Sequence, residues 1–111
     1  MCTLNNIAVA GVGMHEWGKW GRNFVEYGVV AANRALDDAG IPWTDVEFVA
    51  GGVTVRNGYP GYVAGATFAQ ALGWSGAQVT SVYGACATGA QAIDVARARI
   101  LAVDPVGRAR L

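Results

Sequence analysis

Apolar and polar positions alternate along the chain in blocks that predict three strands and three helices in turn. The predicted strands are short, nearly continuous apolar runs, as buried parallel strands are: Ile7–Gly13, Val46–Val55 and Gln78–Tyr83. The predicted helices repeat apolar residues every three or four positions: Asn23–Ala39, Tyr62–Leu72 and the run that follows Cys86 to about Leu101. The order β-α-β-α-β-α with short connections predicts an α/β fold, in which a parallel sheet with right-handed crossovers carries helices on both faces.

The first predicted helix has the clearest limits. Asn23 can cap its N-terminus together with Glu26, and Gly40 followed by Pro42 ends it. Its apolar stripe consists mostly of small residues, which predicts close packing against a sheet: Phe24, Gly28, Ala31, Ala32, Ala35, Leu36 and Ala39. The glycine pair Gly51–Gly52 inside the second strand predicts a bulge or a close backbone neighbour.

Composition limits the class of protein. The 111 residues fit one domain, 53% are hydrophobic and 14% are charged, which excludes a disordered tail. Eight basic and eight acidic residues give a formal net charge of zero, which argues against a nucleic-acid partner. No apolar run is long enough to predict a membrane span, and no signal peptide is evident. The tail 103–111 is predicted to be irregular.

Cys86 is the principal candidate for chemistry. It follows the third predicted strand and opens the third helix, where backbone N–H groups and the helix dipole favour a thiolate. The alternative is a small buried cysteine that only packs. Cys2 lies far away in sequence, so neither a disulfide framework nor a zinc cluster is predicted, and a reducing compartment follows. His15, the single histidine, could act as a base near Cys86, but loop packing is favoured.

The segment Val82–Ala92 resembles the nucleophile segment of the thiolase superfamily. It is closest to the sterol-carrier-protein-type (lipid-transfer) branch, in which Cys-Ala-Thr-Gly also opens the third helix. Val9–Met14 and Ala32–Ile41 resemble the same branch, and the similarity runs from about Ile7 to Ala102. The resemblance implies that residues 1–111 form the N-terminal part of a thiolase-like N-terminal domain, and hence a partial thiolase-like half-fold.

The resemblance also implies an activity. Cys86 would be acylated by an acyl-CoA in lipid or steroid breakdown, with coenzyme A as cosubstrate and without a bound cofactor or metal. The family's activating histidine and second cysteine come from a second half, so residues 1–111 alone are expected to be inactive. The family strand order 3-2-1-4-5 and its dimer, formed through the third strand, would make Val79–Val82 the contact of a homodimer.

Two other functions stay open. Some lipid-transfer-type members resemble thiolases but act as retro-aldolases, or lyases, on steroid side-chain acyl-CoAs together with a small OB-fold partner. A non-catalytic acyl-CoA-binding or interaction fragment is the other. Gly84–Ala85 departs from the Asn that many thiolases carry, and Ala87–Gly89 departs from the related ketosynthases. A cytoplasmic location is expected, with peroxisomal targeting through Ala109–Leu111 as the weaker alternative.

Overall fold

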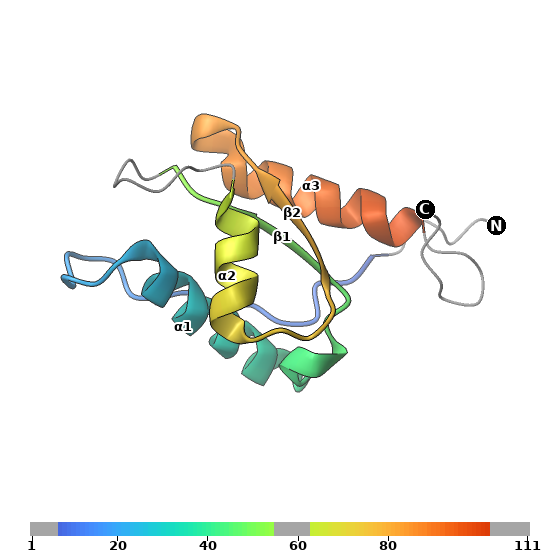
Figure 1. Cartoon of the computed structure of the whole chain (residues 1–111), viewed down its shortest axis with the longest axis horizontal. Helices are drawn as coiled ribbons and strands as arrows, with labels where there is room; N and C mark the ends of the chain where they lie inside the picture. The colour runs from blue at the N-terminus through green and yellow to red at the C-terminus, as the bar shows by residue number, and fades with distance from the viewer. Residues whose placement is uncertain (1–6, 55–62, 103–111) are drawn as a thin grey trace.

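The computed structural model describes residues 7–54 and 63–102 and has an α/β fold (Figure 1). Strands β1 (Phe48–Gly52) and β2 (Gln78–Val82) pair in parallel, with Phe48 opposite Gln78 and Gly52 opposite Val82. The predicted α/β class and the parallel pairing of these two segments are therefore confirmed.

All three predicted helices are present. In chain order the helical elements are α1 (Phe24–Ala39), the 3-10 turn η1 (Trp43–Asp45), α2 (Ala64–Leu72), the 3-10 turn η3 (Ala85–Ala87) and α3 (Thr88–Leu101). Cys86 lies in a tight turn just before α3, as the sequence predicts. Val55, Tyr62 and the predicted irregular tail 103–111 lie outside the described residues.

Local sequence signals set both ends of α1. The Asn23 side chain accepts a hydrogen bond of 3.0 Å from the Glu26 N–H, and the Glu26 carboxylate accepts one of 3.1 Å from the Asn23 N–H. At the other end Gly40 has φ 69°, a left-handed conformation that glycine adopts without a steric penalty. The capping box and the glycine stop are thus confirmed.

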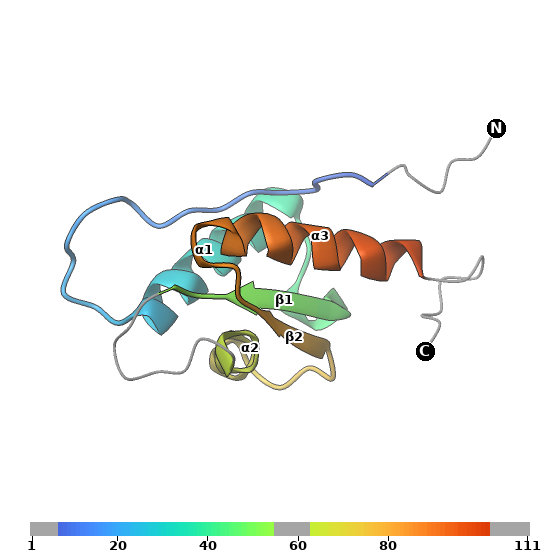
Figure 2. The ribbon, with the colours of Figure 1, turned by 90° about the horizontal axis from the view of Figure 1, so that it is seen from above.

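The sheet carries a helix on each face, and the glycine pair of β1 makes this possible. A side chain at Gly51 would lie 2.7 Å from the Cα of Gly65 in α2, whereas one at Gly52 would collide with the Thr88 methyl group at the start of α3. Because neighbouring strand residues point to opposite faces, α2 and α3 cover opposite faces (Figure 2). The close backbone neighbour predicted for this pair is Gly65.

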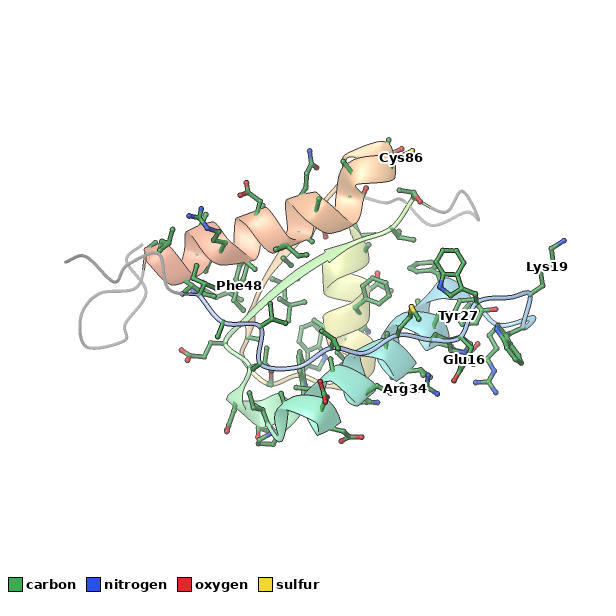
Figure 3. The ribbon with its side chains drawn as sticks, turned by 180° about the vertical axis from the view of Figure 1, so that it is seen from behind. Glu16, Lys19, Tyr27, Arg34, Phe48 and Cys86 are labelled. Carbon is green, nitrogen blue, oxygen red and sulfur yellow. The ribbon has the colours of Figure 1, made fainter. Side chains whose placement is uncertain are left out.

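The prediction of a strand at Ile7–Gly13 is wrong. This segment runs along α1 without joining the sheet (Figure 3). The Val12 N–H donates to the Asp38 carboxylate at 2.9 Å in place of a ladder bond, and Val9 is 80% exposed. Gly11 and Gly13 allow the approach, since a Cβ on Gly11 would lie 2.7 Å from the Ala39 nitrogen. The pattern placed Gly11 and Gly13 at the end of a strand, but these glycines instead let the backbone contact α1.

The small-residue face of α1 consequently packs differently from its prediction. Gly28 leaves room for the Phe68 ring of α2, and the Phe24 and Phe68 rings meet edge-to-face with centroids 5.7 Å apart. Ala31 and Ala35 lie against the N-terminal segment at Gly13. The face therefore contacts α2 and the extended segment, and packing chiefly against the sheet is not observed.

In the part of the chain that is described, no helix has the length and apolar character to cross a membrane.

Candidate functional site

Cys86 lies in η3, at the carboxyl end of β2 and immediately before α3 (Figure 3). Its thiol is free and the residue is exposed. The alternative interpretation, a small buried cysteine that only packs, is therefore wrong. In parallel α/β sheets the carboxyl ends of the strands are where ligands bind, so the position is suited to chemistry.

Thr88 holds the turn that presents Cys86. Its hydroxyl accepts a hydrogen bond of 3.0 Å from the Gly84 N–H and donates one of 2.8 Å to the Ala85 carbonyl. The residue is only 6% exposed, so water does not compete strongly for these bonds. One buried hydroxyl thus joins the end of β2 to the first residue of α3 and fixes the backbone on both sides of the cysteine.

The backbone of this turn is strained just before the cysteine. Ala85 has φ 50°, and among the described residues no other non-glycine has a positive φ. Such conformations cost about 1–3 kcal/mol and persist where the surroundings determine them. A Cβ at Gly84 would meet only the end of the exposed Gln91 side chain on α3, which can turn away. The strain of this turn therefore lies at Ala85.

Sequence reasoning identified Cys86 but missed the residue that supports its turn. Thr88 belongs to the segment that resembles thiolases, but it received no role. The available signal was a hydroxyl residue at the start of a helix, where Ser and Thr commonly bond to nearby backbone groups. The strain at Ala85 had no sequence signal, since alanine does not ordinarily mark a left-handed position.

His15 is not brought to Cys86. Its ring lies 4.7 Å from that of Tyr27 and 5.9 Å from that of Trp20, and its Nδ1 lies 2.9 Å from the Glu16 carbonyl oxygen. Glu16 and Tyr27 lie well away from Cys86 in the structure (Figure 3). The histidine therefore packs in its loop, as favoured from the sequence, beside a hollow of about 300 Å³ that Met14 and Trp17 also line.

Glu16 in the same loop has a lowered pKa and joins the loop to α1. The pKa of Glu16 lies below its ordinary value of 4.5, first because its carboxylate bonds to its own backbone N–H and second because Arg34 donates to it. The Arg34–Glu16 ion pair measures 2.8 Å, and Arg34 also donates to the Met14 carbonyl at 2.7 Å. These bonds join the loop to α1, which is a structural role.

The described residues show no metal site, and comparison with known proteins gives no family. Among residues 7–54 and 63–102, no group of three or more His, Cys, Asp or Glu side chains is placed to hold a metal ion. Comparison of the sequence with models of known protein families and with curated proteins gives no match. The resemblance to thiolases therefore rests on the sequence segments quoted above alone.

Proposed function

We propose that Cys86 is the acyl-accepting nucleophile of a thiolase-type acyltransferase. The observation that supports this most strongly is an exposed, free thiol at the carboxyl end of β2, on a strained turn fixed by Thr88. Packing alone gives no reason to hold an exposed cysteine on strained backbone. A nucleophile that must meet a bulky thioester does give one.

The chemistry assigned to the thiol is attack on a carbonyl carbon. With an acyl-CoA, the Cys86 sulfur forms the new S–C bond and the coenzyme A thiolate leaves. With a 3-oxoacyl-CoA, attack at the 3-keto carbon breaks the bond between carbons 2 and 3, and the acetyl-CoA carbanion released takes up a proton. Coenzyme A then accepts the acyl group from the cysteine. The negative charge that develops on the carbonyl oxygen needs N–H donors, and the N-terminus of α3 is the nearest helix end that favours it.

Complete turnover requires an acid/base group that the described residues do not place beside Cys86, because His15 packs elsewhere. The proposal therefore assigns this chain the acyl-accepting half of the reaction. The resemblance to thiolases alone supports two further parts of the proposal. These are a homodimer through Val79–Val82 and an OB-fold partner protein.

Alkylation of single-cysteine variants tests whether acyl-CoA reaches the thiol. In Cys2→Ala, which leaves Cys86 as the only thiol, acetyl-CoA should slow labelling by iodoacetamide in a saturable way. In the matched variant Cys86→Ala, labelling of Cys2 should be unaffected. Equal labelling rates with and without acetyl-CoA in Cys2→Ala would contradict the proposal. Protection without any acyl adduct would also contradict acyl transfer, and would favour the retro-aldolase instead.

A further inference from the structure

A second hollow lies at the end of the sheet opposite to Cys86. It measures about 700 Å³, within the range of small-molecule sites. The starts of both strands, the loop before β2 and the C-terminal half of α3 form it, and its lining residues include Val46, Phe48, Ser75, Gln78, Arg99 and Ile100. Phe48 and Cys86 lie at opposite ends of the strands (Figure 3), so this hollow is separate from the thiol.

Arg99 is the cation of this hollow, and its position is fixed. Its guanidinium carbon lies 5.6 Å from the centre of the Phe48 ring, and its Nη2 donates to the side-chain oxygen of Gln78. A guanidinium has five N–H donors, so this bond leaves others for a ligand. The cation–π contact with Phe48 and the hydrogen bond to Gln78 both restrict the Arg99 side chain. Less conformational entropy is therefore lost when a carboxylate binds.

Ser75 supplies a polar group that lacks a partner. Its hydroxyl oxygen is buried, with less than 1 Å² accessible, and it makes no hydrogen bond within the described part of the chain. Because this oxygen is inaccessible from the hollow, it can bond to a ligand only if the side chain turns, and Arg99 is the donor on which recognition depends. Ser75 lines the same hollow as Arg99.

We propose that this hollow binds a small aliphatic carboxylate. The carboxylate would accept hydrogen bonds from Arg99, while the chain would lie along the apolar wall of Val46, Phe48 and Ile100. Glu47 also lines the hollow and is exposed. Its negative charge repels a carboxylate and attracts an amine. Removal of this charge therefore has opposite effects on the binding of these two classes of ligand. The proposal is independent of the role of Cys86.

Titration of the ¹⁵N-labelled 111-residue chain with octanoate and octanamide tests this site. Octanoate should shift the amide signals of Ser75, Gly76 and Gln78 in a saturable way. Octanamide, which lacks the charge, should bind at least about tenfold more weakly. Arg99→Gln should weaken octanoate binding by a similar factor, whereas Glu47→Gln should tighten it. Arg97→Gln, an exposed arginine on the same helix that is not part of the lining, should leave it unchanged.

Several outcomes would overturn the proposal. Equal affinity for octanoate and octanamide would show an apolar hollow without charge recognition, and this comparison needs no variant. Equal losses in Arg97→Gln and Arg99→Gln would assign the effect to net charge. Circular dichroism of each variant identifies loss of folding, and Arg99→Lys, which keeps the charge, should then retain part of the binding. Shifts confined to the turn at Cys86 would place the ligand elsewhere and reject the site.

Discussion

At the scale of single residues, the account depends on how the Cys86 turn is held. Removal of the Thr88 hydroxyl leaves the Gly84 N–H without its partner, whereas the Ala85 carbonyl keeps the hydrogen bond from the Thr88 backbone N–H. The methyl group of Thr88 also fills the space above Gly52 on β1. These two parts of one side chain can be separated by substitution.

Thr88→Val keeps the shape of the side chain and removes the hydroxyl. We expect it to lower the free energy of unfolding by about 1–2 kcal/mol, because the part-buried Gly84 N–H loses its partner. Thr88→Ser keeps the hydroxyl and loses only the methyl group, so its loss should be about 1 kcal/mol. Urea unfolding followed by circular dichroism measures both. A smaller loss for Val than for Ser would show that the hydrogen bonds do not hold the turn.

Glu16 gives a second prediction at this scale, concerning pH. Its pKa in the folded chain is lowered, first by its backbone bond and then by Arg34, so its stabilising contribution is complete above the ordinary pKa of 4.5. That contribution is lost as the pH falls through the lowered folded value. Arg34→Gln should raise the pKa of Glu16 partway, since the backbone bond remains. Lys19→Gln, in the same loop, should change it less. An NMR titration in which Arg34→Gln leaves the Glu16 pKa unchanged would contradict this assignment.

At the scale of elements, the contact between α1 and α2 depends on a glycine. A methyl group at Gly28 would overlap the Phe68 ring, which Phe24 contacts edge-to-face. The side chain cannot be accommodated unless the ring or one of the helices shifts.

Gly28→Ala should therefore destabilise the fold by about 1–2 kcal/mol, because overpacking outweighs the gain in helix propensity. Gly89→Ala is the matched control: it also lies in a helix, but its new methyl group meets nothing within 4 Å. It should stabilise the chain by about 0.5–1 kcal/mol. Thermal unfolding compares the two. Stabilisation by both substitutions would show that α1 and α2 pack less closely than described.

The elements also show what a sequence can and cannot predict. The limits of α1 follow from Asn23, Glu26 and Gly40, which act through local hydrogen bonds and backbone conformation. The run Ile7–Gly13 has the same apolar pattern as a buried strand, but pairing is a tertiary property that the pattern does not contain. In the site, Cys86 was predicted, whereas the strain at Ala85 and the hollow beside Arg99 depend on contacts between distant segments.

At the scale of the whole molecule, the sheet places two sites at its two ends. The carboxyl end of β2 presents the Cys86 thiol, and the starts of both strands open onto the hollow with Arg99. The buried apolar side chains of the described residues are few: Phe24, Ala64, Ala69 and Val82. Glycines and alanines let the layers approach closely, but they bury little surface. We therefore expect modest stability, and substitutions of about 1–2 kcal/mol should be readily measurable.

The central claim is that Cys86 accepts an acyl group. Its most direct measurement is mass spectrometry of peptides from the chain after incubation with acetyl-CoA, with Cys2 of the same molecule as the internal reference. The account predicts an acetyl thioester on Cys86 that forms faster than any on Cys2, saturates with acetyl-CoA and is reversed by free coenzyme A. No thioester on Cys86, or equal acetylation of the two cysteines without saturation, would contradict it.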